Sequence, residues 1–498
     1  MAGRMVFAGS VLAAALVGAG TALVAQNVAT PAADPPARTE VAQVPALPPN
    51  PALAERRVPA TRADAQASYA PVVARAAPAV VNVYAKTIRR EVFRSPFADD
   101  PVFRRFFGDQ FGVPRERVEN SLGSGVIVRP DGVIVTNNHV VAGATELRVV
   151  LADRREFPAR VIVTDPRSDL AVLQIDTGGE RLAALTFADT RDALVGDQVL
   201  AIGNPFGVGQ TVTGGIISAL ARTDIGITDF SFFIQTDAAI NPGNSGGALV
   251  DMNGALVGVN TAIFSRDGGS AGVGFAVPAE MVKRVVESAL ADGRIVRPWT
   301  GARAQTVDAE IARTMSLSRP GGAVLTELYP GGPAERAGLR RGDVIVALGG
   351  ADVADEQGLR YLAATRRPGE RVPVVYMRGG QRGEAQITLQ PPPSTPAREE
   401  RVIAARSSFQ GAKVATLNPA TADEAGLDAF TRGVLILDVA ADSPAAREGL
   451  RPGDLILELG GEPVATASGL EGRLRGDGRR GQVILQRGDR RLTATLFL

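Results

Sequence analysis

The sequence predicts a mainly β protein in which one large β domain is followed by two similar, smaller α+β modules. From residue 68 to about residue 292, short apolar runs such as 80–84, 125–128 and 171–175 alternate with Gly, Asp, Asn and Pro turns, as is typical of closed all-β folds. In the C-terminal part, one long motif occurs twice, which indicates two modules of one kind. A chain of 498 residues is long enough for about three domains.

The composition narrows the classes of function. Hydrophobic residues make up 45% of the chain and charged residues 21%, which is typical of globular domains. Lys plus Arg (54) nearly equals Asp plus Glu (53), so the chain has no basic excess of the kind that binds nucleic acid. With no Cys and one His, it lacks the usual ligands of a thiolate or imidazole metal site. We therefore expect no cofactor, no metal and no nucleic-acid partner.

The N-terminus has the pattern of an export signal. Arg4 precedes an apolar run over residues 5–25, which ends in small residues and is followed by a polar stretch. The run is also long enough to span a bilayer as an uncleaved anchor. We expect residues 1–27 to be a signal peptide or an N-terminal anchor, and residues 28–67, rich in Pro and Ala, to be an extended linker.

Three short motifs carry residue types that together can activate a serine. His139, the only histidine, follows an apolar strand run and lies in a polar turn. Asp169 precedes another apolar run, and Ser245 lies among glycines in Asn-Pro-Gly-Asn-Ser-Gly-Gly. A serine hydroxyl needs a base within hydrogen-bond reach, and the base needs a carboxylate that fixes its tautomer. The order His, Asp, Ser matches the chymotrypsin-like arrangement, so we predict that these three residues form a catalytic triad.

Other arrangements of a catalytic serine fit the sequence less well. Residues 243–247 also satisfy the G-x-S-x-G pattern of α/β-hydrolases, but that fold needs its histidine after the serine, and the only histidine comes before it. A subtilisin-like order would need an aspartate upstream of the histidine, and Asp109 and Asp131 lie in no supporting motif. A serine–lysine pair has only three lysines in the chain to draw on.

These motifs resemble those of the HtrA/DegP/DegQ family of trypsin-like serine proteases. The matching stretches are 136–140, 168–172 and 235–249, with support from 203–207 and 272–278. The resemblance runs from about residue 68 to the C-terminus. It implies an ATP-independent serine endoprotease of the cell envelope, located in the periplasm, that removes misfolded proteins.

The resemblance also implies how the first domain, residues 68–292, is built. Two six-stranded barrels fit the pattern of apolar runs, with His139 and Asp169 in the first barrel and Ser245 in the second. The active site then lies in the cleft between them. Residues 278–290 have helical spacing and are expected to form a closing helix.

The resemblance extends to the residues around the nucleophile. The oxyanion donors are expected to be the backbone N–H groups of Gly243 and Ser245, with Asn244 as a further candidate. In trypsin-like folds the residue six positions before the serine lies at the base of the substrate pocket, and here it is Ala239, followed by Ile240. Since no acid is in place to bind Lys or Arg, we expect a small apolar pocket for Val, Ile, Ala or Leu, with Ile240 on its wall.

Two further features concern regulation and assembly. Arg222 aligns with the family's sensor-loop arginine, which relays peptide or subunit contacts to the loop before the serine, although a solvated surface arginine is an equal alternative. The segment 92–111 carries many Phe residues among Arg and Asp and is expected to form either a local core cluster or a subunit contact. The family forms homotrimers and larger multiples of trimers.

The repeated motif defines the C-terminal half. Residues 322–350 recur without a gap as residues 433–461, each reading as a strand, a short helix that begins near Pro and ends at Gly, a Gly-Asp turn, and a second strand. These copies resemble PDZ domains, which we place at 297–392 and 402–498. A Pro- and Arg-rich linker at 390–401 separates them.

A PDZ domain adds an extended peptide as an extra strand and holds its C-terminal carboxylate with backbone N–H groups. In the first copy the candidate loop is Trp299, Thr300, Gly301 and Ala302, and in the second it is 409–412. Small Thr300 and Ala302 leave room for a large apolar C-terminal side chain. We expect unfolded proteins and peptide C-termini as partners, although one copy, the second above all, can instead serve assembly alone.

The sequence thus predicts a serine endoprotease that degrades misfolded proteins and is regulated by its PDZ domains. The alternative is a peptide-binding chaperone or scaffold in which proteolysis is secondary. Intact His139, Asp169 and Ser245 favour the enzyme.

Overall fold

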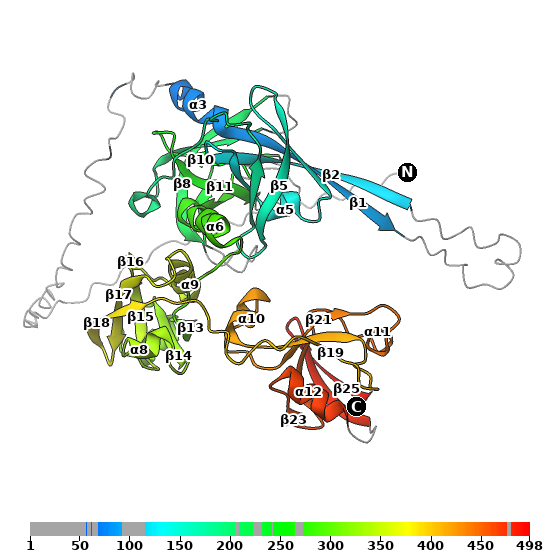
Figure 1. Ribbon diagram of the computed structural model, residues 1–498. Coiled ribbons are helices and arrows are strands. Elements are labelled where there is room, and N and C mark those ends of the chain that lie inside the picture. Colours follow the sequence, from blue (N-terminus) through cyan, green and yellow to red (C-terminus); the bar gives the residue numbers. More distant parts are fainter. Residues whose placement is uncertain are drawn as a thin grey trace, which may run out of the picture. The chain divides into compact units, whose positions relative to one another are not determined.

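The computed structural model describes residues 56, 61, 68–91, 115–204, 209–222, 232–241, 243–263, 272–475 and 480–498 (Figure 1). The chain divides into two compact units, Met1–Val58 and Pro59–Leu498, and every element below lies in the second. The expected signal 1–27, nearly all of the linker 28–67 and the Phe-rich segment 92–111 lie outside the described residues. Among the described residues, no helix is both long and apolar enough to cross a membrane.

The first barrel is a closed sheet with the strand order β1-β2-β3-β6-β5-β4. Its strands are β1 (Val80–Glu91), β2 (Arg115–Arg129), β3 (Val133–Thr136), β4 (Glu146–Val150), β5 (Glu156–Asp165) and β6 (Leu170–Ile175). α3 (Ala70–Ala76) and the 3-10 turn η1 (Ala77–Ala79) precede it, and α5 (Asn138–Val141) follows β3. β3 lies between its antiparallel neighbours β2 and β6 and is buried along its whole length, with Val133, Ile134 and Val135 in the hydrophobic core.

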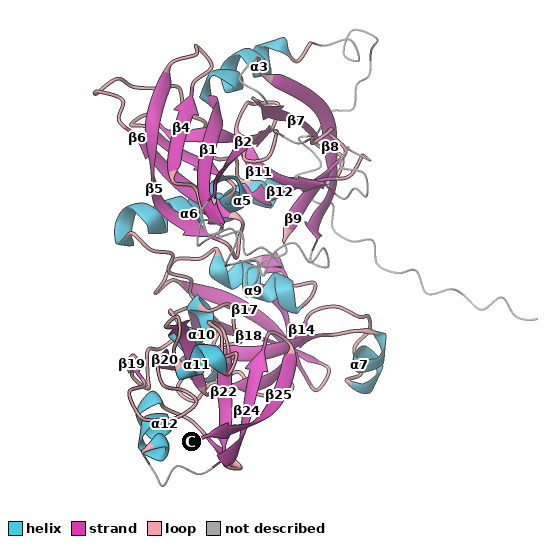
Figure 2. Cartoon of the chain, turned by 90° about the vertical axis from the view of Figure 1, so that its right-hand side faces the viewer, coloured by secondary structure: helices cyan, strands magenta, loops and turns pink. Residues whose placement is uncertain are grey.

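The second barrel is also closed, with the order β10-β11-β12-β9-β8-β7. Its strands are β7 (Gln198–Gly203), β8 (Thr211–Arg222), β9 (Phe233–Thr236), β10 (Ala248–Val250), β11 (Leu256–Ile263) and β12 (Gly274–Pro278), and the 3-10 turn η3 (Thr190–Asp192) precedes it. The prediction of two six-stranded barrels is therefore confirmed. Strands dominate the whole described chain (Figure 2).

A helix closes the barrel domain. α6 (Ala279–Asp292) begins directly after Pro278 and ends at Gly293, whose φ of 62° is left-handed and suits glycine at a helix end. Its buried residues, Ala279, Met281, Val282, Val285, Val286, Ser288 and Ala289, recur at helical spacing. The helix occupies the place expected for residues 278–290 and runs a little beyond it.

The two repeats fold into sheets that share one order of five strands, and the second sheet carries one more strand at an edge. The first contains β13 (Ala302–Thr306), α7 (Ala309–Thr314), β14 (Ala323–Leu328), α8 (Pro333–Arg336), β15 (Val344–Leu348), β16 (Ala351–Asp352), α9 (Glu356–Ala364), β17 (Arg371–Arg378) and β18 (Gln381–Thr388). The second contains β19 (Arg401–Val402), β20 (Ala412–Thr416), α10 (Pro419–Glu424), β21 (Val434–Val439), α11 (Pro444–Arg447), β22 (Leu455–Leu459), β23 (Glu462–Pro463), α12 (Ala467–Leu474), β24 (Arg480–Arg487) and β25 (Arg490–Phe497). We call these the first and second PDZ-like modules.

The Gly-Asp turn recurs because its aspartate has the same task in both modules. Asp343 is 1% exposed and receives Nε of Arg378 at 2.6 Å, and Asp454 is 0% exposed and receives Nε of Arg487 at 2.6 Å. In each copy the carboxylate also accepts a backbone N–H three residues back along the chain. The pair ties the turn before the central strand to the hairpin that follows it, and the carboxylate raises the pKa of the Arg378 guanidinium.

Candidate active site

His139 and Asp169 meet where the first barrel ends in two loops. Nδ1 of His139, in α5, lies 2.7 Å from Oδ2 of Asp169, and the backbone N–H of His139 donates to Oδ1 at 3.0 Å. The imidazole is half exposed, whereas the carboxylate is 10% exposed. Asp169 has a left-handed φ of 53°, and its carbonyl accepts N–H groups of Asn137 and Asn138. Backbone and side-chain bonds together fix how the aspartate faces the histidine.

Thr261 of β11, a residue that the sequence did not single out, links this pair to Ser245. Its hydroxyl donates to Oδ2 of Asp169 at 2.6 Å, and its backbone carbonyl accepts the Ser245 hydroxyl at 3.2 Å. Thr261 is 3% exposed. Within a β-rich run a threonine looks like an ordinary strand former, so the sequence carried no signal for this role.

Ser245 lies in the loop between β9 and β10, and the first barrel holds this loop from behind. Ser124 of β2, fully buried, donates its hydroxyl to the Gly243 carbonyl at 2.6 Å and its N–H to the Ser245 carbonyl at 2.8 Å. Gly246 has φ 83°, and a Cβ there would overlap the Ser124 carbonyl and the Thr136 hydroxyl. Only glycine fits at this position.

The expected oxyanion donors differ in availability. Within the described residues, the backbone N–H groups of Gly243 and Ser245 have no hydrogen-bond acceptor, so they can serve an incoming oxyanion. The N–H of Asn244 donates to the Asn241 carbonyl at 3.0 Å and is therefore already committed. Asn244 as a whole is 1% exposed.

The expected pocket residues lie before the nucleophile loop. Ala239 is half-buried, and its carbonyl accepts the Thr213 hydroxyl at 2.8 Å. Ile240 is 1% exposed and packs in the core of the second barrel. Asp237, which is exposed, accepts the N–H of Ile216 at 2.7 Å, in keeping with a structural part in the barrel.

A buried ion pair supports the loop that carries Asp169. Asp165, the last residue of β5, contacts the guanidinium of Arg297, and the side chains are 4% and 8% exposed. Burial lowers the pKa of Arg297 while Asp165 opposes that effect, and the Ser168 hydroxyl also donates to Asp165. Arg167 donates to the carbonyl and to the carboxylate of Asp423 in α10, at 2.7 and 2.5 Å. Residues beyond the barrels thus hold the Asp169 loop from two sides.

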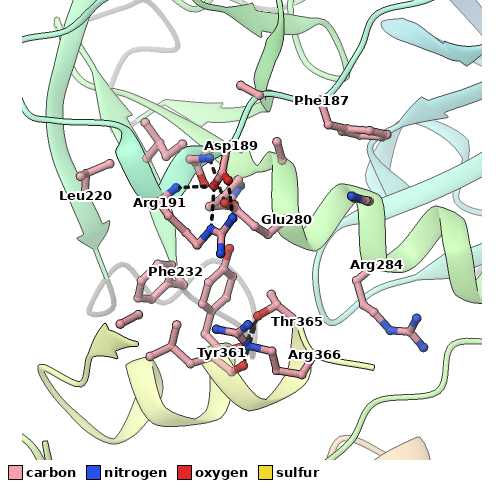
Figure 3. A pocket seen from close by; sticks show the side chains of 18 of the residues that line it. Phe187, Asp189, Arg191, Leu220, Phe232, Glu280, Arg284, Tyr361, Thr365 and Arg366 are labelled. Carbon is pink, nitrogen blue, oxygen red and sulfur yellow. Dashed lines mark hydrogen bonds and ion pairs between the residues drawn. The ribbon is translucent and has the colours of Figure 1, made fainter. Parts of the chain in front are cut away.

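A cavity of 450 Å³ lies between the second barrel, α6 and the first module (Figure 3). On its wall Phe232 stacks on Tyr361 of α9, with ring centroids 3.9 Å apart and planes 11° apart. Burial raises the pKa of Tyr361 well above its usual value, and the nearby Glu280 raises it further. Also on the wall, Arg367 contacts Glu287 of α6 at 3.0 Å. The first module is therefore attached to the barrel domain by a stack and an ion pair.

The candidate peptide loop of the first module leads into an edge strand. Gly301 has φ 70° and its carbonyl accepts the Tyr329 N–H at 2.8 Å, while the Thr300 carbonyl accepts the Ala334 N–H at 2.8 Å. Thr300 and Ala302 line a small apolar cavity with Leu, Ile and Val residues of the module. Trp299 packs beside Tyr329, with ring centroids 5.4 Å apart, rather than in that cavity.

Two other features of the sequence have limited structural description. Arg222 ends β8 and pairs with Phe233, but its side chain lies outside the described residues. Across the described parts of the chain, no three His, Cys, Asp or Glu side chains gather in a way that could hold a metal ion.

Comparisons with known proteins agree with this architecture. Residues 123–259 match the trypsin-like peptidase domain, and residues 301–389 and 410–498 each match the PDZ domain. A probable periplasmic serine endoprotease DegP-like of Chlamydia trachomatis serovar D is 40% identical over 418 residues, covering 81% of this chain and 82% of that protein. A probable periplasmic serine protease do/HhoA-like of Haemophilus influenzae is 38% identical over 404 residues, covering 79% and 84%.

Among solved structures, the HtrA-type protease AlgW with decapeptide is 45% identical and covers 66% of this chain and 100% of that chain, with a TM-score of 0.48. The predicted family, the trypsin-like fold and the two PDZ domains are confirmed. The chain belongs to the HtrA/DegP family and is a periplasmic serine endopeptidase.

Proposed function

We propose that this peptidase degrades misfolded or damaged proteins without ATP, with Ser245 as nucleophile, His139 as general base and Asp169 as the carboxylate that orients the base. The observation that carries the proposal is the 2.7 Å contact between Nδ1 of His139 and Oδ2 of Asp169. With its Nδ1–H donated to the carboxylate, the neutral imidazole keeps its lone pair on Nε2, where it can accept the serine proton.

For attack, the Ser245 hydroxyl leaves the Thr261 carbonyl and turns to Nε2 of His139. The bond it gives up is long, at 3.2 Å, so the turn costs little. The oxygen then adds to the scissile carbonyl, and the N–H groups of Gly243 and Ser245 receive the oxyanion, each contributing roughly 2.7–4 kcal/mol. His139 passes the proton to the leaving amine, and water releases the acyl group by the same steps.

Substrate selection rests on two places. Ala239, which is partly exposed and carries no charge, supports a preference for small or branched apolar side chains before the scissile bond, while Ile240 packs in the core of the second barrel. The first PDZ module, through Thr300, Gly301 and Ala302, is suited to hold the C-terminus of a substrate or an activating peptide. The proposal has two further parts. The domains span residues 68–292, 297–392 and 402–498, and the chain assembles as a homotrimer or a multiple of one.

Casein cleavage by the wild type and by Ser245→Ala tests the chemistry. The alanine variant should lose roughly a millionfold in turnover and keep its folding, because the hydroxyl contributes little to the loop. The matched control is Ser318→Ala, which removes an exposed hydroxyl in the first module and should cleave normally. Cleavage retained by Ser245→Ala would overturn the triad, and a variant that holds unfolded casein without cutting it would reveal a chaperone activity beside proteolysis.

For regulation, Arg222→Ala should lower turnover of folded protein substrates more than turnover of short peptides, measured side by side. Equal kinetics would leave Arg222 as a surface residue. Calorimetry tests the PDZ role. Peptides with a free C-terminus should bind the full chain, and the same peptides with an amidated C-terminus should not.

A further inference from the structure

The two PDZ modules differ at one edge of their sheets. In the first module β13 is the outermost strand of the order β13-β14-β15-β17-β18. The second module has the order β19-β20-β21-β22-β24-β25, so β20, which corresponds to β13, is covered by one more strand. The correspondence follows from the loops before them, because the Gly301 carbonyl accepts the Tyr329 N–H and the Gly411 carbonyl accepts the Ala440 N–H.

The covering segment runs antiparallel to β20, which is the direction in which a peptide is added to the edge of a sheet of this kind. The Thr416 N–H donates to the Arg398 carbonyl at 2.6 Å, at one end of the segment. Arg401 and Val402 then face Val414 and Lys413 in the register. Residues 398–403 therefore follow the strand from its end back to its start.

The segment ends where a bound peptide would place its C-terminus. The Ile403 N–H donates to the Ala412 carbonyl at 2.9 Å, and the Gly411 N–H donates to the Ile403 carbonyl at 2.9 Å. In the first module the corresponding Gly301 N–H has no acceptor within the described residues. The Ile403 side chain is 1% exposed and packs in the same apolar core as Phe409.

Helix α12, which faces β20 across residues 398–403, also contacts this segment. Near the start of α12, the Ser468 N–H donates to the Glu399 carboxylate at 3.2 Å. Further along the helix, Glu471 accepts Nη1 of Arg401 at 3.1 Å. Strand β20 and helix α12 thus hold residues 398–403 between them, as the strand and helix of a PDZ domain hold a peptide.

We propose that residues 398–403 are the resident ligand of the second PDZ module, bound within the same chain, with Ile403 in the place of a substrate's C-terminal residue. This rests on the peptide-binding role proposed above for the first module. Only four residues join Ile403 to Ser408 of the module itself, so the effective concentration of the segment is in the millimolar range or above. A free C-terminus at micromolar concentration cannot displace it, and peptide capture falls to the first module.

Disulfide formation between two introduced cysteines tests directly whether residues 398–403 lie against β20. The chain has no cysteine, so a pair introduced as Val402→Cys and Lys413→Cys in the Ser245→Ala protein is the only one present. These residues face each other in the register, and Val402 is 62% exposed, so the pair is accessible and at bonding distance. The control joins Val402→Cys with Arg490→Cys, on β25 at the opposite edge of the sheet. The facing pair should oxidise at least tenfold faster, within one chain.

Equal oxidation rates for the two pairs would overturn the proposal, and so would disulfides formed mainly between chains. Neither outcome depends on proteolysis or on any peptide, so this test can fail while the proposed function stands.

A second measurement tests whether removing residues 398–403 from β20 frees a peptide-binding site in the second module. Ile403→Asp places a carboxylate in the apolar core and should expel the segment, whereas Val402→Asp changes an exposed position and should not. Calorimetry with a decapeptide that ends in leucine with a free carboxylate should find one more site per chain in folded Ile403→Asp than in Val402→Asp. An equal number of peptides bound per chain in the two folded proteins would contradict the proposal that residues 398–403 occupy the peptide site of the second module. If circular dichroism shows that Ile403→Asp is unfolded, the disulfide pair decides.

Discussion

Replacing Arg297 with methionine should cost both stability and turnover. Arg297 and Asp165 form an ion pair in which both side chains are under a tenth exposed. The methionine keeps much of the side-chain volume but leaves the Asp165 carboxylate buried without its guanidinium partner, although the Ser168 hydroxyl still donates to it. Breaking a buried pair from one side costs about 3–5 kcal/mol. We expect the free energy of unfolding to fall by that amount.

The effect on turnover follows from the position of Asp165, four residues before Asp169. Asp169 has a φ of 53°, a left-handed conformation that costs a residue with a side chain about 1–2 kcal/mol. When the support is lost, the loop can relax out of that conformation, and 1.4 kcal/mol of relaxation corresponds to about tenfold fewer competent molecules. We expect kcat to fall about tenfold with KM little changed, because no group that touches substrate is removed.

Urea unfolding of the Ser245→Ala form measures the stability, and casein cleavage measures kcat and KM. The control is Arg129→Met, which breaks a pair with Asp131 whose side chains are 50% and 54% exposed and should cost less than about 1 kcal/mol. Adding Asp165→Asn to Arg297→Met removes the buried charge and should restore part of the stability. An Arg297→Met protein within 1 kcal/mol of the wild type, with unchanged kcat, would refute the reasoning.

Two further substitutions test the packing around the site. Gly246→Ala should lower casein cleavage about a hundredfold, because its Cβ would overlap the Ser124 carbonyl and shift the nucleophile loop, whereas Gly293→Ala, with nothing within 4 Å, should cleave normally. Tyr361→Ala should lower the free energy of unfolding by about 3–5 kcal/mol, while Tyr361→Phe keeps the stack and the stability at neutral pH. Because burial raises the pKa of Tyr361, its neutral phenol contributes stability below pH ~10, and this contribution is lost as the pH rises further. Above pH ~10, the free energy of unfolding measured in urea should therefore fall less in Tyr361→Phe than in the wild type.

The barrels could be predicted, and His139, Asp169 and Ser245 could be proposed as a triad, because the signals for them are local. Apolar runs between turns indicate closed β-structure, and His139 needs no choice among candidates because it is the only histidine. The glycines around Ser245 likewise indicate a loop of unusual backbone geometry, and Gly246 has a positive φ.

The contacts that hold the site could not be predicted in the same way. Arg297 and Asp165 are 132 residues apart, and nothing local tells which of 54 basic residues meets which of 53 acidic ones. Thr261 is a similar case, since its partner Asp169 is 92 residues away. The Pro and Arg content of 390–401 indicates a linker, yet its last residue belongs to β19. The sequence could not indicate this strand, because two residues are too few to show a period.

Thr261 gives the active site a mechanical property. Ser245 belongs to the second barrel and Asp169 to the first, yet each is bonded to the same residue of β11, one through its carbonyl and the other through its hydroxyl. If one barrel slides against the other, the bond between Thr261 and Asp169 stretches, whereas Ser245 and Thr261 lie in the same barrel and move together. The Thr261 hydroxyl is thus the link that keeps Asp169 aligned with the loop of Ser245. Heating should therefore leave turnover intact until the barrels part, and activity should vanish over the same few degrees as the tertiary structure.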